Sequence, residues 1–330
     1  MTTKYLVDPE IVAILDVFPS FQFTAEDLPR IRAEAAAMGA QMASGLPDFP
    51  DVEVTERRVP GPQGAPDVRV LVYLPKEAPR PLPALLWIHG GGYIIGTADG
   101  DDQQAKQMVS RVGCAVVSVD YRLAPETPHP GPVEDCYAGL QWLHTHASEL
   151  EVDPDRIAIG GASAGGGLAA GLGLLTRDRG EIPLAFQFLI YPMLDDRTVT
   201  TNDPHPYTGE FIWTPASNLF GWSALLGQEP GGADVSPYAA AARAESLSAL
   251  PPTYIGVGAL DLFLEEDLEY ARRLIREGVP TELHVYPGAF HGFNMVAESG
   301  VSQAHNRDSM SALRRGLRTG DLAPGVPSRP

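Results

Sequence analysis

Ser163 lies in a glycine-rich stretch whose residue types suit a serine nucleophile. Its neighbours read Gly161-Ala162-Ser163-Ala164-Gly165, between a short apolar run and a run of small, helix-compatible residues. This pattern predicts a sharp strand-to-helix turn that exposes one serine hydroxyl. The turn requires residues with almost no side chain at positions 161 and 165, and the helix N-terminus that follows favours negative charge beside the serine.

The same stretch allows three other interpretations. Residues 157–175 carry no charge and could span a bilayer as a helix, although their glycine density and strand-like start argue against this. Gly165 and Gly167 resemble a dinucleotide-binding loop, but they lie inside the predicted helix rather than in the turn before it. A chance match to the short pattern is the third interpretation. Residues elsewhere in the chain must therefore distinguish between these interpretations.

A serine hydroxyl is a poor nucleophile at neutral pH and needs a general base within hydrogen-bond distance. Only His89 and His291 come after the end of a strand-like run, and the other histidines lie on predicted helices, inside a strand or in proline-rich loops. We predict that His291 is the base. His89 opens a glycine run and is expected to brace that loop. The chain has eight histidines, namely His89, His129, His144, His146, His205, His284, His291 and His305.

The base in turn needs an anionic partner that orients the imidazole and stabilises its charged form. Asp261 is the first acidic residue after the apolar run at 253–257, and we predict that it fixes the imidazole tautomer. Glu265 and Glu266 on the following helix, and Asp195 after an earlier strand, are the alternatives.

Attack by a serine creates an oxyanion, which requires hydrogen-bond donors. The loop His89-Gly90-Gly91-Gly92 lets its backbone approach a substrate closely, because the three glycines have no side chains. The backbone N–H of Ala164, directly after the serine, is expected to be the third donor. A tight turn alone would also explain three glycines, but not why they end a strand near the serine.

These candidate groups all follow strands of one predicted sheet. Helical patterns alternate with buried apolar strands along most of the chain, which predicts an α/β fold with a mostly parallel, eight-stranded sheet flanked by helices. Ligands bind at the carboxyl ends of such strands, where Ser163, Asp261 and His291 are placed. The first two strands are expected to form an antiparallel edge pair. The predicted strands cover 52–59, 68–74, 84–88, 115–119, the run from 157 towards the serine, 186–190, 253–257 and 282–286.

Composition narrows the class of protein further. The net charge of −18 and the pI of about 4.7 argue against nucleic acids and anionic membrane surfaces as partners. Cys114 and Cys136 lie in apolar patterns and are expected to be buried thiols. The first 18 residues contain only a short apolar run, interrupted by Asp8 and Asp16, and no signal-peptide pattern. We expect a cytoplasmic protein.

Five motifs together resemble the bacterial hormone-sensitive-lipase-like carboxylesterases of the α/β-hydrolase superfamily. Their order places serine, aspartate and histidine as in α/β-hydrolases, and they extend over about 68–296. The resemblance implies a carboxylic-ester hydrolase without metal or cofactor, with Gly91, Gly92 and Ala164 as oxyanion donors. The motifs are HGGGY (89–93), DYRLAPE (120–126), GASAGG (161–166), GALD (258–261) and YPGAFHGF (286–293).

The resemblance also implies a helical cap. We expect residues 1–45 and 196–245 to form it, 46–195 and 246–320 to form the catalytic domain, and 321–330 to be a loose tail. Two residues depart from the family: Ala162 replaces a common acidic residue before the serine, and Leu262 replaces a frequent proline after the aspartate. Activity is expected to survive the first change, with an altered pH dependence.

The aromatic-rich insert suggests short to medium acyl esters as substrates. Amidase, lactonase, carbamate-cleaving or deacetylase activity uses the same oxyanion and stays open, and a non-catalytic small-molecule receptor is a further alternative. An exposed edge strand is available for pairing in a homodimer. The candidate pocket residues, each of which could equally belong to the core, are Tyr93, Phe211, Trp213 and Phe293.

Overall fold

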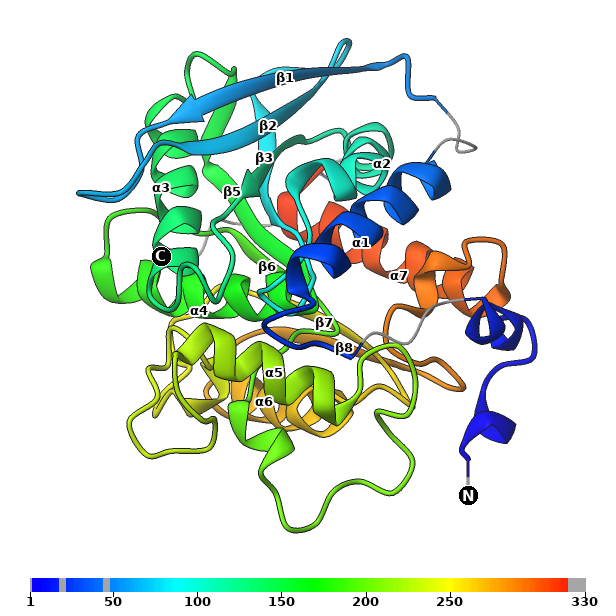
Figure 1. Cartoon of the computed structure of the whole chain (residues 1–330). Coiled ribbons are helices and arrows are strands. Elements are labelled where there is room, and N and C mark those ends of the chain that lie inside the picture. The colour runs from blue at the N-terminus through cyan, green and yellow to red at the C-terminus, as the bar shows by residue number, and fades with distance from the viewer. Residues whose placement is uncertain (1, 18–21, 44–47, 320–330) are drawn as a thin grey trace.

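A single twisted sheet forms the centre of the molecule (Figure 1). The computed structural model describes residues 2–17, 22–43 and 48–319. Within these residues, eight strands lie in the order β1-β2-β4-β3-β5-β6-β7-β8. Their bounds are β1 Val52–Val59, β2 Val68–Pro75, β3 Leu82–Ile88, β4 Ala115–Asp120, β5 Val152–Ala162, β6 Phe186–Ile190, β7 Thr253–Gly258 and β8 Thr281–Tyr286.

Strand direction follows the prediction. β2 pairs antiparallel with both β1 and β4, whereas the neighbours from β4 to β8 pair in parallel. The predicted antiparallel edge pair and the mostly parallel sheet are therefore confirmed. β5 lies in the middle of the parallel part, between β3 and β6, so the residues after β5 face the centre of the sheet's carboxyl edge.

Helices cover both faces of the sheet, which explains why its central strands are apolar without alternation. Leu86 and Ile88 pack with the core that α3, α4 and α6 complete, whereas Leu85 and Trp87 pack with α2 and α7. All seven residues of β3 are buried. The covering helices are α2 Asp102–Val112, α3 Gly131–Thr145, α4 Ala164–Arg179, α6 Leu264–Arg276 and α7 Gly300–Leu317.

The apolar stretch 157–175 is divided between β5 and α4. A membrane-spanning helix is therefore the wrong interpretation of these residues. In the part of the chain that the structure describes, no helix is long and apolar enough to cross a membrane. Cys114 and Cys136 are free, buried thiols, as predicted.

The helical pattern of the first 45 residues is only partly realised as α-helix. Residues 2–17 contain two short 3₁₀ turns, Lys4–Leu6 and Val12–Asp16, and α1 covers Leu28–Ala43. The β-branched residues of the first segment favour a helix weakly, and tertiary contacts fix it instead. Its Ile11 is completely buried, and the Asp8 N–H donates to the Gly288 carbonyl at 3.0 Å.

Two helices lie outside the sheet layers, next to its carboxyl edge. α1 crosses in front of the loops after β3 and β4, and α5 (Pro215–Leu226) lies below it in the same view (Figure 1). Leu28 of α1 and Ala224 of α5 share a small buried cluster with Ile94 and Ala124. Within 196–245, the other helical pieces are the 3₁₀ turns Asp196–Val199 and Ala241–Arg243.

Some predictions about domains and assembly stay predictions. The expected loose tail at 321–330, and residues 1, 18–21, 44 and 45 of the expected cap, lie outside the described residues. β1 and β8 are the edge strands of the sheet. Val285 on β8 is 40 % exposed, and pairing of an edge strand in a homodimer stays a prediction.

Candidate active site

Ser163 occupies the sharp turn that its glycine neighbours predict. β5 ends at Ala162 and α4 begins at Ala164, and the serine between them has φ 57° and ψ −122°. A Cβ atom on Gly161 would lie 2.3 Å from the Gly165 carbonyl oxygen, and one on Gly165 would lie 2.1 Å from that of Ile88. The two glycines are therefore required because the turn packs directly against backbone, which leaves no room for a side chain.

Three side chains from three different strand ends meet at this turn. His291 Nε2 lies 2.9 Å from Ser163 Oγ, and His291 Nδ1 lies 2.9 Å from Asp261 Oδ2. Asp261 is fully buried, and its second oxygen accepts the Phe263 N–H at 3.0 Å. Ser163 is 6 % and His291 7 % exposed, so the hydroxyl and the imidazole are shielded from bulk water but still accessible.

Aromatic rings fix the orientation of the imidazole. Phe263 meets the His291 ring edge to face at 5.2 Å between centroids, and Tyr191 meets it at 4.8 Å. Trp213 lies 6.4 Å from it on the α5 side. Each contact is of the tilted or edge-on kind that aromatic pairs favour, so the ring is positioned by packing as well as by its two hydrogen bonds.

The alternative acids have other roles in the structure. Glu265 is exposed on α6, and Asp195 pairs with Arg197 and caps the turn at 196–199. Glu266 is buried and accepts the Leu194 N–H at 2.6 Å, which holds the chain after β6. Burial raises the pKa of Glu266 well above its usual value. None of these carboxylates is within hydrogen-bond distance of His291 Nδ1, whereas Asp261 is.

The glycine loop after β3 lies beside the serine. Gly91 has φ 114°, and Gly92 has φ 59°, so glycine is favoured at both positions. A Cβ on Gly90 would lie 3.4 Å from the Ser163 Cβ, which measures how closely the loop approaches. Among the described residues, no backbone carbonyl accepts a hydrogen bond from the N–H of Gly91, Gly92 or Ala164. These three N–H groups are therefore left without a backbone acceptor among the described residues.

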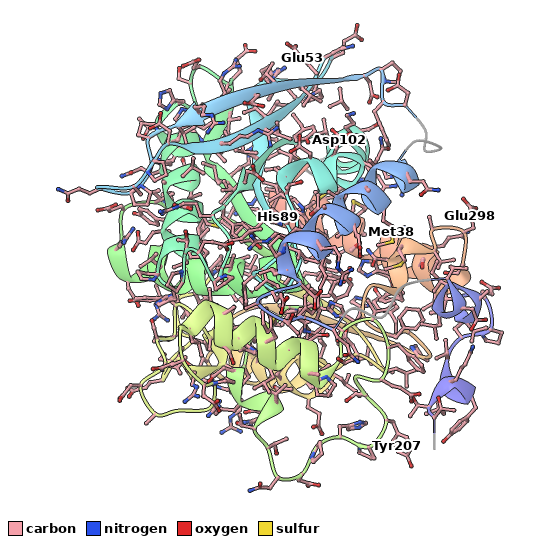
Figure 2. All side chains as sticks on the ribbon, in the orientation of Figure 1. Met38, Glu53, His89, Asp102, Tyr207 and Glu298 are labelled. Carbon is pink, nitrogen blue, oxygen red and sulfur yellow. The ribbon has the colours of Figure 1, made fainter. Side chains whose placement is uncertain are left out.

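His89 braces this loop, as predicted. It lies in the interior of the molecule (Figure 2) and is 2 % exposed. Its Nδ1 donates to the Gly90 carbonyl at 2.8 Å, and its ring stacks on Tyr121 at 4.3 Å. Burial lowers the pKa of His89, which favours the neutral ring. His89 therefore supports the loop and does not compete with His291 for the serine.

The end of β4 and the segment after it hold the same loop and the chain that follows it, a role that residue-by-residue reasoning missed. Asp120 accepts the Ala98 N–H at 2.9 Å, the Tyr121 hydroxyl donates to the His89 carbonyl at 3.1 Å, and the Ala124 N–H donates to the Tyr93 carbonyl at 2.9 Å. The position of Asp120 directly after the predicted strand 115–119 was the available signal; in the structure it is the last residue of β4.

Arg32 of α1 connects the N-terminal part to these loops, and it too was missed. Its Nε donates to the Ile94 carbonyl at 2.8 Å and one terminal nitrogen donates to the Ala124 carbonyl at 2.9 Å. The same guanidinium pairs with Glu126 at 2.7 Å. An arginine in a helical pattern gives no sequence signal for such a contact, because two of the partners just named are backbone carbonyls.

The predicted pocket residues separate into two groups. Tyr93 and Phe293 are completely buried; the Tyr93 hydroxyl donates to the Met193 carbonyl, and Phe293 packs against Tyr191. Both are core residues here, the alternative that sequence left open. Trp213 and Phe211 belong to the segment before α5, and Trp213 lies beside His291. Tyr207 lies at the outer end of the same segment and is 49 % exposed (Figure 2).

The hydrogen bonds between Ser163, His291 and Asp261 form with both departures from the family pattern in place. Ala162 is half-buried at the end of β5 and packs against the core beneath α7. Leu262 is 9 % exposed and packs against Gly209: a Cβ atom added to Gly209 would lie 2.7 Å from the Leu262 Cδ1 atom. Within the described residues, no group of three or more His, Cys, Asp or Glu side chains could hold a metal ion.

A buried serine–histidine–aspartate arrangement at the carboxyl edge of a mostly parallel sheet, with free N–H groups beside the serine, defines a serine hydrolase. The similarity of this chain to known proteins agrees with this class. Residues 85–295 match the family model described as the alpha/beta hydrolase fold. The chain therefore belongs to the α/β-hydrolase fold family, among its hormone-sensitive-lipase-like carboxylesterases, as the motifs predicted.

Named relatives cover nearly the full chain. Carboxylesterase NlhH of Mycobacterium tuberculosis is 35 % identical over 319 residues, which are 94 % of this chain and 96 % of the relative. An arylesterase of Saccharolobus solfataricus is 29 % identical over 87 % of this chain and 92 % of its own. The solved structure of a bacterial heroin esterase is 45 % identical, with a TM-score of 0.91 over 96 % of this chain and all of the other.

Proposed function

We propose that the protein hydrolyses carboxylic esters through an acyl-enzyme intermediate on Ser163. The observation that carries this proposal is the continuous hydrogen-bonded line from Ser163 through His291 to Asp261, with 2.9 Å at each of its two links. Both distances are within the range in which a base can take a proton from a nucleophile.

In the first half of the reaction, Ser163 Oγ attacks the ester carbonyl carbon while His291 Nε2 takes the hydroxyl proton. The protonated imidazole then gives that proton to the departing alcohol oxygen. Asp261 holds Nδ1 in its protonated form and stabilises the imidazolium. In the second half, His291 activates a water molecule, which releases the acid and restores the serine.

The N–H groups of Gly91, Gly92 and Ala164 are proposed as donors to the oxyanion. Ala164 is the first residue of α4, so its N–H points out of the helix N-terminus, where the helix dipole favours negative charge. The positive φ values of Gly91 and Gly92 orient the loop backbone beside the serine. Donors fixed before the reaction are worth several kcal/mol of transition-state stabilisation, about 3–4 for one such donor.

We further propose that residues 1–45 and 196–245 act as a cap over 46–195 and 246–320. Support comes from α1 and α5, which lie next to the carboxyl edge and pack on the Gly90–Gly92 loop and its neighbours. Arg32 and Leu28 supply contacts from α1. Gly221 of α5 lies so close that a Cβ there would be 2.8 Å from the Gly92 carbonyl oxygen.

The preferred substrates are proposed to be esters of short to medium acyl groups. Aromatic residues of the segment before α5 reach the histidine loop, where Phe211 packs against Phe290, the neighbour of His291, and this supports a site of limited size. Amide, lactone or acetyl-group cleavage would use the same machinery, because all pass through the same oxyanion. A panel of aryl, alkyl and lactone substrates ranks these activities.

The test is Ser163→Ala, with Ser148→Ala as a matched control on the exposed surface. With p-nitrophenyl acetate, we expect Ser163→Ala to lower kcat by roughly 10⁶-fold, as loss of the nucleophile does in comparable triads, and Ser148→Ala to change nothing. A fluorophosphonate should label the native chain once, on Ser163, as read by peptide mass. Undiminished turnover by Ser163→Ala would refute the proposal, and absence of labelling would favour a receptor.

A further inference from the structure

The segment before α5 contains an unusual turn. The backbone N–H of Trp213 donates to the Phe211 carbonyl at 2.7 Å, and Ile212 between them has φ 63°. A hydrogen bond across one residue with positive φ is the rare, strained form of the γ-turn, and a β-branched residue with positive φ is a genuine outlier. Such strain persists only where surrounding contacts enforce it, and it gathers at functional sites.

The turn places the Trp213 indole on the glycine loop. A Cβ on Gly92 would lie 2.0 Å from the Trp213 Cη2 atom, so the ring occupies the space beside a proposed oxyanion donor. The indole N–H donates to the buried Asn218 side chain of α5 at 3.0 Å. The ring is 6 % exposed and 6.4 Å from the His291 ring. It therefore connects the oxyanion loop, the catalytic histidine and the cap.

Contacts on both sides keep the turn in place. Glu210, directly before it, accepts the Thr3 N–H at 2.5 Å and the Thr3 hydroxyl at 2.6 Å. Phe211 packs against Phe290, the neighbour of His291, at 6.0 Å. The turn is thus attached to the N-terminal segment and to the histidine loop. These attachments over-determine the position of Trp213.

We propose that Trp213 is a specificity-determining residue that limits the size of the alcohol part of the ester. The inference rests on the proposed function. The alcohol oxygen must receive its proton from His291 Nε2, so the alcohol lies on the histidine side of the tetrahedral carbon. Trp213 is the cap side chain beside that histidine, and it also closes the space next to Gly92. The acyl chain leaves the tetrahedral carbon in another direction and does not meet this ring.

The experiment compares Trp213→Phe and Trp213→Leu with the native chain and with Trp142→Phe. Trp142 stacks on His146 of the distant α3 segment and serves as a matched control. One substrate series keeps the acetyl group and varies the alcohol from methanol through butanol to cyclohexanol and menthol. The other keeps p-nitrophenol and lengthens the acyl group from acetate to octanoate. Circular dichroism and phosphonate labelling establish that each variant is folded.

We expect Trp213→Phe to raise kcat/KM for cyclohexyl relative to methyl acetate by about tenfold, the scale on which pocket walls discriminate size. Trp213→Leu should raise it further. The ratio of octanoate to acetate should change by less than about twofold, within the range of a pocket left intact, and Trp142→Phe should change neither ratio.

A change confined to the acyl series, an equal change in both series, or no change in either would overturn the inference. Each of these outcomes requires a native chain that hydrolyses esters. A folded native chain that hydrolyses no ester in either series would instead refute the proposed function. The two failures are therefore distinguishable in one data set.

Discussion

Replacing Asp261 by asparagine tests the geometry of the proposed triad most directly. One carboxylate oxygen accepts the Phe263 N–H at 3.0 Å, and the other faces His291 Nδ1 at 2.9 Å, in a fully buried position. An asparagine has one acceptor and one donor group. Its oxygen must stay on the Phe263 N–H, because two donors facing each other in a buried site would each lose a hydrogen bond, at about 1–3 kcal/mol per group.

The amide NH₂ then faces His291 Nδ1 and holds that nitrogen in its unprotonated form. The proton moves to Nε2, which can no longer take the proton of Ser163. The same tautomer error lowers kcat by about 10⁴-fold in serine proteases, equivalent to about 5 kcal/mol of transition-state stabilisation. We expect a loss of that size in Asp261→Asn with p-nitrophenyl acetate, and a parallel loss in the rate of fluorophosphonate labelling.

Asp195→Asn is the control, since Asp195 was an alternative acid and pairs with Arg197 on the surface side. It should retain activity within about threefold, because substitutions away from buried networks change free energies by roughly 0.5 kcal/mol. A loss below about 10²-fold in a folded Asp261→Asn chain would refute the tautomer argument. A large loss in Asp195→Asn would mean that the wrong carboxylate is assigned.

Two further substitutions test the cap and a buried charge. Arg32→Ala should lower the free energy of unfolding, measured in urea, by about 1–3 kcal/mol, because charge-assisted hydrogen bonds to two carbonyls are lost. Arg30→Ala is the control and should leave the free energy of unfolding unchanged, because the partners of Arg30 are exposed. Equal effects of the two substitutions would contradict the role of Arg32 in docking α1 on the loops. Asp267 is fully buried, neither carboxyl oxygen has a partner among the described residues, and burial, with Glu266 and Asp261, raises its pKa. A carboxyl whose pKa is raised in the folded state makes stability fall as pH rises from the ordinary aspartate range through the folded value. Asp267→Asn should therefore stabilise the chain more at about pH 8 than at about pH 4. The reverse order of stabilisation in urea titrations would refute the raised pKa of Asp267.

Strand positions and the triad were predictable because their signals are local. Buried parallel strands are continuous apolar runs, and chemical groups placed directly after such runs must meet at one edge of the sheet. Ser163, Asp261 and His291 were found in this way, although they are up to 128 residues apart. The glycines around Ser163 were predictable for the same reason, since the turn itself excludes side chains.

The cap and the pocket could not be derived in the same way. Residues 196–245 have little periodic pattern, so only the family resemblance implied helix there, and neither the bounds of α5 nor the aromatic ring that reaches His291 was predicted. Tyr93 and Phe293 follow the motifs as closely as any pocket residue would, yet both are core. The directions of their side chains depend on the backbone conformation, such as the positive φ of 69° at Tyr93, which the residue type does not predict.

The sequence by itself determined the positions of the strands along the chain, the nucleophile, its base and the family, because each rests on residue types at fixed places along a regular element. Only the tertiary structure decided the order of the strands in the sheet, the docking of Arg32 on the loops beside the serine, and the strained turn at Ile212 that sets Trp213 on the glycine loop. These features depend on contacts between segments far apart in the chain, such as Glu210 with Thr3, and such contacts leave no periodic trace in the sequence.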